Sequence, residues 1–373
     1  MPPVVIDLRS TDDSRDVVHR AVQALAESKI VAFPTETVYG LAASALSEEA
    51  VGRLLAALPA EQPRTLTLAV KSADEALDYI PDLGPLGQRL ARRCWPGPVT
   101  LVFDDGHPDS LLRQLCPAVQ HALAPEGLVA LRVPAHQTIL DVLRLLAGPV
   151  VLSSARSPGQ VEAVTAQQVV EALDDRVQLV LDDGRSRFGQ PASVVRIRER
   201  EFDVLEVGVV SPQTLKRLSS VIVLFVCTGN TCRSPMAEGM FRQLLASRLG
   251  CPVEQVEERG AIVMSAGIAA MLGGRPAAEA VDVMSQMGLD LSGHESQPLT
   301  EQLVRHADLI VAMTRSHRQA ILADWPEAAD RVQLLCRDGS DVPDPVGGPA
   351  EQYRRCAEQM KPELEKWASE LKL

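Results

Sequence analysis

The sequence predicts an α/β protein with two domains: an N-terminal domain with a twisted mixed sheet, and a C-terminal domain with a doubly wound parallel sheet. Three observations support this fold class. The chain has 373 residues, more than one ordinary hydrophobic core accommodates. Short apolar runs alternate with helix-like runs along its whole length. A helix-like stretch that begins with proline separates the two series near residue 213.

The first half of the chain is predicted to occupy residues 1–212. It starts with an amphipathic, helix-like segment at 14–29 and a strand at 30–33. Strand-like runs recur at 65–70, 99–103, 129–133, 150–152, 177–181 and 193–197. Helix-like runs lie between them at 48–58, 85–93, 138–147 and 166–172. Residues 213–219 are interpreted as a connector.

The second half, residues 220–373, repeats the alternation in a more regular form. Strands are predicted at 221–226, 261–265, 309–313 and 332–335. Helices are predicted at 235–249, 276–287, 299–306, 316–323 and 349–371. Strands that alternate with helices in this way form parallel sheets with helices on both faces, so this half is predicted to be doubly wound.

Composition and charge narrow the class of protein. Apolar residues make up 46% of the chain and charged residues 23%, which is typical of a folded globular protein. The net charge of −12 disfavours general binding to nucleic acid or to anionic membranes. Neither a membrane span nor a signal peptide is recognisable, and the seven cysteines lack metal-ligand spacing. We expect a cytoplasmic protein with free thiols, no membrane association and no metal; its oligomeric state is left open.

The segment Cys227-Thr-Gly-Asn-Thr-Cys-Arg-Ser-Pro235 carries the strongest functional signature. An apolar strand precedes it and a helix follows, so Cys227 enters a tight loop that closes at a helix N-terminus. The backbone N–H groups of such a loop and the helix dipole bind phosphate and stabilise a thiolate. Arg233 is placed to hold two phosphoryl oxygens at once. The loop is predicted to be a phosphatase site, with these further members: Thr228, Gly229, Asn230, Thr231, Cys232 and Ser234.

Two further features of this site follow from the sequence. Ser234 and Pro235 are expected to be the N-cap and first residue of the helix. In the run Asp341-Val-Pro-Asp-Pro345, Asp344 is predicted to protonate the leaving group and then to activate the water that hydrolyses phosphocysteine. Asp341 is interpreted as a structural neighbour. This chemistry requires no cofactor.

These residues resemble the low molecular weight protein phosphatase family over nearly all of residues 220–373. The resemblance implies a phosphoprotein substrate and a buried network that holds the loop. It also implies that Cys232 can form a reversible disulfide with Cys227, although a thiol that only packs the loop fits the sequence equally well. Further matching segments are Ser265-Ala-Gly267, Asp290-Leu-Ser-Gly-His-Glu-Ser296, Ala307-Asp-Leu-Ile-Val-Ala-Met-Thr314 and Asp344-Pro345, and the implied network consists of Asn230, Ser234, Ser265 and His294.

Two positions bear on substrate specificity. Tyrosine-directed relatives usually carry an aliphatic residue where this chain has Thr231, and aromatic residues after the Asp-Pro pair. Here the pair is followed by Val346-Gly-Gly348, so a phenyl ring would lack stacking partners. The Thr231 hydroxyl suits a phosphorylated guanidine, and these features resemble the protein-arginine phosphatase branch. We therefore favour phosphoarginine, with phosphotyrosine as the alternative.

The first half contains Pro34-Thr-Glu-Thr-Val-Tyr-Gly-Leu-Ala42, which resembles the signature of the threonylcarbamoyl-AMP synthase (YrdC-like) family. Members join threonine, bicarbonate and ATP into an adenylate used in tRNA modification. The resemblance also implies double-stranded RNA binding. The resemblance covers about residues 5–212. It implies an N-terminal ligand pocket that includes Thr35, Tyr39, Thr100, Arg132, Ser154 and Ser193, of which Thr35, Thr100 and Arg132 would hold threonine and Ser154 would face the nucleotide.

The first half also departs from that family's pattern. The family's Lys-x-Arg pair, which grips the phosphates of ATP, is replaced by residues 58–60, and a late arginine is replaced near Glu206. Arg64 and Arg156 are candidate substitutes. Each lost cation removes a charge-assisted contact worth about 1.5–3 kcal/mol. Two hypotheses follow: a working synthase that uses ATP, or a retained scaffold that binds a small ligand, RNA or a partner. We favour the scaffold.

Overall fold

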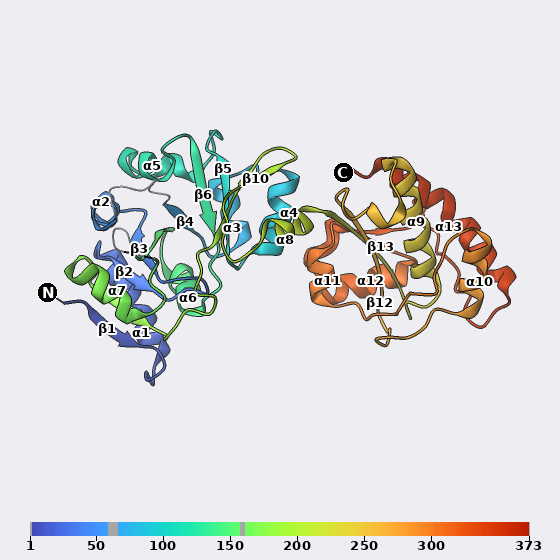
Figure 1. Ribbon diagram of the computed structural model, residues 1–373, viewed down its shortest axis with the longest axis horizontal. Coiled ribbons are helices and arrows are strands. Elements are labelled where there is room, and N and C mark those ends of the chain that lie inside the picture. Colours follow the sequence, from blue (N-terminus) through green and yellow to red (C-terminus); the bar gives the residue numbers. More distant parts are fainter. Residues whose placement is uncertain (1, 59–65, 157–160, 373) are drawn as a thin grey trace. The chain divides into compact units, whose positions relative to one another are not determined.

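The computed structural model describes residues 2–58, 66–156 and 161–372. The chain divides into two compact units, Met1–Leu215 and Lys216–Leu373, and each contains one β-sheet (Figure 1). The predicted α/β fold class, with a mixed sheet followed by a parallel sheet, is confirmed. The boundary between the units falls inside helix α8 (Pro212–Ser219), which covers the whole of the expected connector, residues 213–219.

The sheet of the first unit has ten strands and mixes parallel with antiparallel pairs. Its central strands are buried on both faces, as their continuous Val, Ala and Leu runs predict. Strand β10 pairs antiparallel with β9 at one edge, and a register shift lies between Val204 and Glu206. The order across the sheet is β1 (Val4–Asp7), β8 (Leu179–Asp182), β2 (Val31–Phe33), β3 (Gly40–Ser44), β7 (Val150–Ser154), β4 (Thr67–Ala69), β6 (Leu128–Arg132), β5 (Val99–Asp104), β9 (Ser193–Ile197) and β10 (Phe202–Glu206).

The helices of the first unit begin where the sequence places capping residues. Ser47 accepts a hydrogen bond from the backbone of Ala50, and Thr165 accepts one from Gln168, so each satisfies an N–H group that the helix leaves unpaired. The helices are α1 (Ser14–Ala26), α2 (Glu48–Ala57), α3 (Ala73–Tyr79), α4 (Gly84–Cys94), α5 (Pro117–Leu123), α6 (Gln137–Leu145) and α7 (Ala166–Leu173).

The second unit has a four-stranded, fully parallel sheet. Its order is β12 (Ala261–Gly267), β11 (Val221–Cys227), β13 (Leu309–Ala312) and β14 (Val332–Leu334). Strand β11, the first of this unit in the sequence, pairs with both β12 and β13, so the connections reverse direction beside β11. A reversal of this kind creates a crevice at the carboxyl ends of the strands, which is where ligands bind in doubly wound folds.

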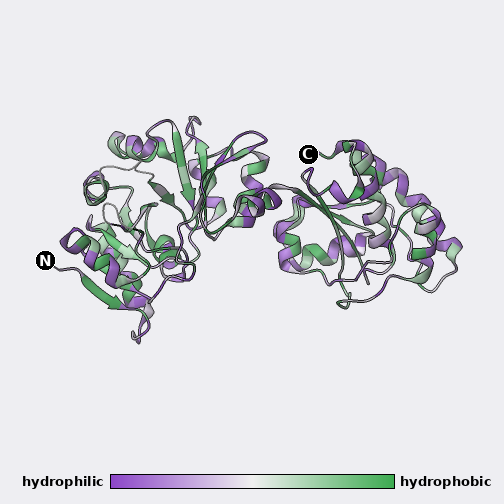
Figure 2. Cartoon of the chain, viewed as in Figure 1, coloured by the Kyte–Doolittle hydropathy of each residue, from purple (hydrophilic) through white to green (hydrophobic). Residues whose placement is uncertain are grey.

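Helices cover both faces of this parallel sheet. One core joins β11 and β12 to α9 (Arg233–Leu249), α10 (Ala278–Gln286) and α13 (Ala350–Glu370). The other joins β13 to α11 (Glu301–His306) and α12 (Arg315–Asp324). Figure 2 shows the strands in green, for hydrophobic residues, and the outer faces of the helices largely in purple, for hydrophilic residues. The sheet is therefore buried on both sides, which fixes the ends of β11 and β12 where the phosphate-binding loop begins.

Candidate active site and N-terminal pocket

The loop after β11 surrounds the sulfur of Cys227. This residue ends the strand and is 2% exposed. The backbone N–H of Asn230 donates to Cys227 Sγ at 3.3 Å, and the Ser234 hydroxyl lies 3.0 Å from the same sulfur. Helix α9 begins directly after the loop, so its positive N-terminal end also faces the sulfur. Both contacts and the dipole stabilise negative charge on sulfur.

The expected capping by Ser234 is wrong. Helix α9 begins at Arg233, one residue before Ser234, with Cys232 at the N-cap and no side-chain cap. The Ser234 hydroxyl is instead shared between Cys227 and Asn230, which donates to it at 3.0 Å. The Ser234 hydroxyl can bind either within the loop or to the first turn of the helix, and in this structure it binds within the loop.

Asn230 is the centre of the network that holds the loop. It is fully buried and has a φ of +54°, a left-handed conformation that asparagine adopts more readily than most residues. Its side-chain NH₂ also donates to Ser265 Oγ at 2.8 Å, and its Oδ1 accepts from the backbone of Gln297 at 2.8 Å. His294 Nε2 lies 2.9 Å from the Asn230 carbonyl. The structure therefore brings together Asn230, Ser234, Ser265 and His294.

Glu238 extends this network and was not singled out from the sequence. The Ser265 hydroxyl donates to its carboxylate at 2.6 Å, and Arg242 pairs with the same carboxylate at 2.6 Å. Glu238 and Arg242 are one helical turn apart on α9, the spacing that favours such pairs. The network thus ties the loop, β12 and the first turns of α9 into one hydrogen-bonded assembly.

Arg233 and Asp344 face each other beside the loop. Arg233 is 4% exposed, and its NH2 group lies 2.5 Å from Asp344 Oδ2. A second donor of the guanidinium reaches the Val342 carbonyl at 3.2 Å. The Nε of Arg233 is buried and has no hydrogen-bond partner among the described residues. An unpaired, buried guanidinium N–H at a phosphate-type loop is suited to a phosphoryl oxygen.

Asp341 has a different environment from Asp344. Its Oδ1 accepts from the backbone N–H of Arg315 at 2.8 Å, and its carboxylate also contacts the Arg315 guanidinium at 3.4 Å. The backbone hydrogen bond from Arg315, with the side-chain contact, lowers the pKa of Asp341. Asp341 is therefore bound at the start of α12, whereas Asp344 is exposed beside the loop and pairs with the loop arginine, Arg233.

His317 contacts the loop and was missed by sequence reasoning. It is buried, its Nε2 lies 2.9 Å from Thr228 Oγ1, and its Nδ1 lies 2.8 Å from Thr314 Oγ1. Burial, and then the nearby charge of Arg233, lower the pKa of His317 to about 4. A neutral imidazole therefore bridges α12 and the loop at neutral pH. Its position three residues after the matching segment that ends at Thr314 was the available signal.

Replacing His317 by Gln is expected to change how stability depends on pH. In the unfolded chain this histidine titrates near its ordinary value of 6.5, so the unfolded state takes up the proton first as the pH falls. The stability that neutral His317 contributes to the folded second unit is fully present above pH 6.5, and it is lost as the pH falls toward 4. The decrease in the free energy of unfolding of the second unit between pH 7 and pH 4 should therefore be up to about 3 kcal/mol smaller in His317→Gln. Urea unfolding at both pH values measures this, and equal decreases in both proteins would refute it.

Thr231 and Cys232 complete the loop. The Thr231 hydroxyl is partly exposed, and its hydrogen-bond partner among the described residues is the Cys232 sulfur at 3.6 Å. Cys232 is buried, a free thiol, and lies 3.6 Å from the Tyr353 hydroxyl. The segment after β12 packs against the loop through backbone bonds from Ile268 and Ala269 to the Cys227 and Thr228 carbonyls. Its exposed side chains include three large apolar ones, Ile268, Met271 and Leu272, and the charged Arg275.

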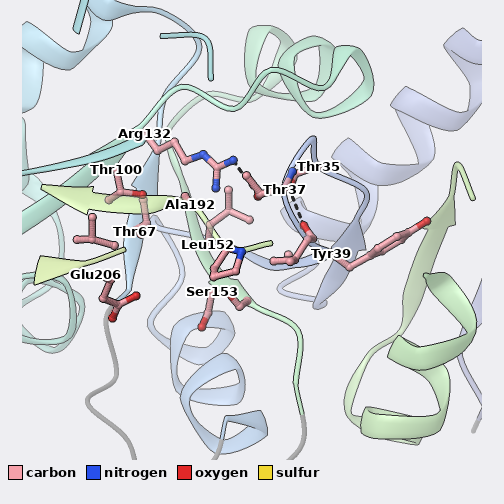
Figure 3. Close-up of a pocket in the computed structure, with 15 residues that line it drawn as sticks. Thr35, Thr37, Tyr39, Thr67, Thr100, Arg132, Leu152, Ser153, Ala192 and Glu206 are labelled. Carbon is pink, nitrogen blue, oxygen red and sulfur yellow. Dashed lines mark hydrogen bonds between the residues drawn. The ribbon is translucent and has the colours of Figure 1, made fainter. Parts of the chain in front are cut away.

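The first unit has a pocket beside the signature segment (Figure 3). Five of the six predicted pocket residues line it: Thr35, Tyr39, Thr100, Arg132 and Ser154. Ser193 lies outside the lining. Its hydroxyl donates to the Val210 carbonyl at 2.8 Å and accepts from the backbone of Gly208 and Val210, so it holds a loop instead.

Two of these lining residues are already engaged within the protein. The Tyr39 ring extends away from Arg132, and its hydroxyl donates to the Gly184 carbonyl at 2.7 Å. Arg132 donates to Glu36 at 2.6 Å and to Thr37 at 3.0 Å. Both charges of the Arg132–Glu36 pair are nearly buried, so Glu36 offsets the positive charge that Arg132 brings to the pocket.

The rest of the lining carries little positive charge. Glu206, on β10, places its carboxylate in the pocket near the end opposite Tyr39. Arg156 pairs with Glu162 at 3.2 Å and is not part of the lining. Arg64 and most of the stretch that replaces Lys-x-Arg lie outside the described residues. The described lining therefore has no uncompensated cation for a triphosphate.

Two wider searches of the described residues gave negative results. Across residues 2–58, 66–156 and 161–372, no three His, Cys, Asp or Glu side chains are grouped so that they could hold a metal ion. In the same part of the chain, no helix combines the length and apolarity needed to cross a membrane.

A buried cysteine in a strand–loop–helix turn, a facing arginine and an adjacent carboxylate define the class of cysteine-dependent phosphatases. The model of the family described as "Low molecular weight phosphotyrosine protein phosphatase" matches residues 222–373, and the Sua5/YciO/YrdC model, described as "Telomere recombination", matches residues 23–208. The chain belongs to the low molecular weight protein phosphatase family through its second unit and to the Sua5/YciO/YrdC family through its first.

Individual relatives resemble each half separately. A protein-arginine-phosphatase of Bacillus subtilis is 37% identical over 154 residues, which are 40% of this chain and 96% of the relative. A threonylcarbamoyl-AMP synthase of Pyrococcus abyssi is 36% identical over 177 residues, 46% of this chain and 48% of the relative, so the chain spans about half its length. The crystal structure of Pyrococcus abyssi Sua5 complexed with L-threonine is 23% identical, with a TM-score of 0.50, and covers 70% of this chain and 92% of that one. This last likeness concerns the fold alone.

Proposed function

We propose that the second unit is a phosphoprotein phosphatase that acts on phosphoarginine through a phosphocysteine intermediate. The observation that carries this proposal is the loop geometry: the buried Cys227 sulfur contacts the Asn230 N–H and the Ser234 hydroxyl, and the Arg233 Nε has no hydrogen-bond partner among the residues that the structure describes. Arg233 and the loop N–H groups hold the phosphoryl group, and the Cys227 sulfur attacks phosphorus opposite the leaving nitrogen. The P–N bond breaks as Asp344 donates a proton to that nitrogen.

The second step regenerates the enzyme. The Asp344 carboxylate accepts a proton from water as the water oxygen attacks phosphorus, the S–P bond breaks, and inorganic phosphate leaves. Arg233 contributes in both steps because its charge offsets the charge that develops on the equatorial oxygens. Its existing bond to Asp344 also keeps the acid next to the loop.

The preference for arginine rests on the surroundings of the loop. The Thr231 hydroxyl is available to accept a hydrogen bond from a guanidinium N–H. The segment after β12 exposes Ile268, Met271, Leu272 and Arg275, and Val346 follows Asp344; none of these side chains offers a ring for stacking. The name of the Bacillus subtilis relative, a protein-arginine-phosphatase, points in the same direction. Phosphotyrosine, which the family's description names, is the alternative.

Replacing Thr231 by Ile is expected to reverse the preference. The variant loses the acceptor for the guanidinium and gains an apolar surface for a phenyl ring, so kcat/KM for a phosphoarginine peptide should fall by about 10–100-fold while kcat/KM for a phosphotyrosine peptide rises. Thr231→Ser, which keeps the hydroxyl, is the matched control. A wild-type chain that turns over phosphotyrosine far faster than phosphoarginine would end the arginine proposal.

For the first unit we propose a retained scaffold that binds a small ligand, RNA or a partner rather than a synthase that uses ATP. Its pocket encloses about 90 Å³, below the roughly 300–1,000 Å³ of typical ligand sites. Glu206 and the compensated Arg132 give its described lining no net attraction for phosphates. Threonine remains the ligand that this pocket fits best, because threonyl and seryl hydroxyls dominate its polar lining.

The competing function is an active L-threonylcarbamoyladenylate synthase, which the Pyrococcus abyssi relative favours. Incubating the full chain with threonine, bicarbonate and ATP, and measuring pyrophosphate, separates the two. We expect release no greater than in a reaction without threonine. Strong threonine-dependent release would establish the synthase and refute the scaffold.

A further inference from the structure

A second, larger pocket lies on the other side of the signature segment of the first unit. It encloses about 400 Å³, within the range of small-molecule sites, whereas the first pocket encloses about 90 Å³ by the same measure. Four segments form its walls: 34–36, 96–98, 135–137 and 183–188. Thr35 contributes to both pockets.

The walls of this second pocket are held in place by hydrogen bonds. The backbone N–H of Phe188 donates to the Glu36 carbonyl at 2.9 Å, and that of Ser186 donates to the Val164 carbonyl at 2.9 Å. The Tyr39 hydroxyl donates to the Gly184 carbonyl at 2.7 Å. The segment 183–188 is therefore fixed against the signature segment, so a ligand would enter a preformed site and lose little affinity to ordering of the walls.

Positive charge exceeds negative charge around this pocket. Arg185 and Arg187 line it, are exposed, and form no ion pair within the described ranges 2–58, 66–156 and 161–372. Of the two carboxylates that line it, Glu36 is neutralised by Arg132, which leaves Asp183 against two guanidinium groups. Asp183 in turn lies 3.1 Å from His136 Nε2. The pocket therefore favours an anion even when His136 is neutral.

The lining also contains a buried polar atom that lacks a partner. Ser186 is 7% exposed, and its Oγ has no hydrogen-bond partner in the described part of the chain. The Nε of Arg233 at the phosphate loop has the same status. A buried polar group of this kind destabilises the folded protein unless something pairs with it. A ligand atom that reaches this hydroxyl would satisfy it.

Apolar surface completes the pocket. Pro34, Pro96 and Pro98 form rigid walls, and the exposed Phe188 ring lies 5.2 Å from the Arg187 guanidinium. Flat apolar walls beside cations suit a ligand with a planar body and an anionic group.

We propose that this pocket binds a small organic phosphate, with the phosphate group on Arg185, Arg187 and the Ser186 hydroxyl and a planar body against the prolines and Phe188. The site is distinct from the threonine-type pocket, whose lining does not include Arg185, Ser186 or Arg187. It is also independent of the phosphatase chemistry in the second unit. The first unit would therefore bind a ligand at a place other than the threonine-type pocket that its family resemblance implies.

The test uses AMP as the probe, because AMP joins a phosphate to a planar ring. The full chain carrying Arg233→Ala, which weakens phosphate binding at the loop, is titrated calorimetrically. We expect AMP binding to persist, adenosine to bind at least tenfold more weakly, and Arg185→Ala combined with Arg187→Ala to weaken AMP binding by about tenfold or more. Arg200→Ala, an exposed arginine on the 198–201 turn, is the matched control and should change nothing.

Ser186→Ala provides a second readout. It removes an unsatisfied hydroxyl from the free protein, so it should weaken AMP binding without lowering the melting temperature. If Arg233→Ala does not fold, the unsubstituted chain is compared with the arginine pair variant, which should bind one AMP fewer. AMP binding that is unaffected by the arginine pair, or absent once the loop is altered, would overturn the proposal.

Discussion

Replacing Cys227 by Ser is expected to abolish phosphatase activity while phosphate binding persists. Serine retains the shape of the loop and its donors, but its hydroxyl is a far weaker nucleophile than a thiolate at neutral pH. The loop N–H groups and Arg233 are untouched, so phosphate still has its partners. We expect kcat to fall by at least about 10⁴-fold, with phosphate affinity within a few-fold of the unsubstituted chain.

The control is Cys251→Ser. Cys251 follows the C-terminal end of α9, and a 17-residue helix separates it from the loop by roughly 25 Å. This variant should retain full activity, which shows that loss of an arbitrary thiol has no effect. Initial rates with a phosphoarginine peptide, and calorimetric titration with phosphate, provide the two readouts. Full activity in Cys227→Ser would show that the sulfur is not the nucleophile.

Replacing Asp344 by Ala is expected to slow turnover by about 10²–10⁴-fold. The loss should be greatest for substrates with a strongly basic leaving group, because such a group cannot depart without a proton. Phenyl phosphate should therefore be affected more than p-nitrophenyl phosphate, whose leaving group is stable as an anion. Removal of the carboxylate also leaves the Arg233 NH2 group without its 2.5 Å partner, so a modest change in KM is expected.

Asp341→Ala is the matched control for this variant. It removes a carboxylate from the same loop, but one that is bound to the backbone and side chain of Arg315 at the start of α12. We expect a small loss of stability and an unchanged dependence on the leaving group. If Asp341→Ala, rather than Asp344→Ala, steepened that dependence, the two assignments would have to be exchanged.

The part of the site that is contiguous in sequence was predictable. Strand, loop and helix between residues 221 and 249 follow from an apolar run, a glycine-containing turn and a helix-forming stretch, and the structure places them as β11, the loop and α9. The predicted strands and helices of the second unit all have counterparts, because each has a clear period of its own. Helix α9 starts earlier than predicted because the Ser234 hydroxyl binds within the loop.

Features that depend on distant contacts were not predictable from the residues alone. His317 reaches the loop across 89 positions of sequence and Tyr353 across 121; the closeness of His317 to a matching segment was the available signal for the first contact, and no local pattern indicates the second. In the first unit, strands β1, β3 and β10 were missed. Gly40–Ser44 has no β-branched side chain and, apart from Leu41, only small residues, so its strand conformation depends on pairing with β2 and β7.

The first unit also shows why a motif does not determine a pocket. The signature segment is present, yet Arg132 forms an ion pair with Glu36, and the Tyr39 hydroxyl donates to the Gly184 carbonyl. The pairing of Glu36, a residue of this segment, with Arg132 outside it determines which charged groups remain available to a ligand.

The central claim is that the Cys227 sulfur attacks phosphorus, and a phosphoenzyme trap tests it most directly. Asp344→Ala is mixed with a phosphorylated substrate, quenched rapidly under conditions that preserve S–P and N–P bonds, and digested for mass spectrometry. The account predicts phosphate on the peptide that contains Cys227, attached to sulfur, and its absence in Asp344→Ala combined with Cys227→Ala. Phosphate on another residue, or turnover with no phosphate ever attached to that sulfur, would contradict it.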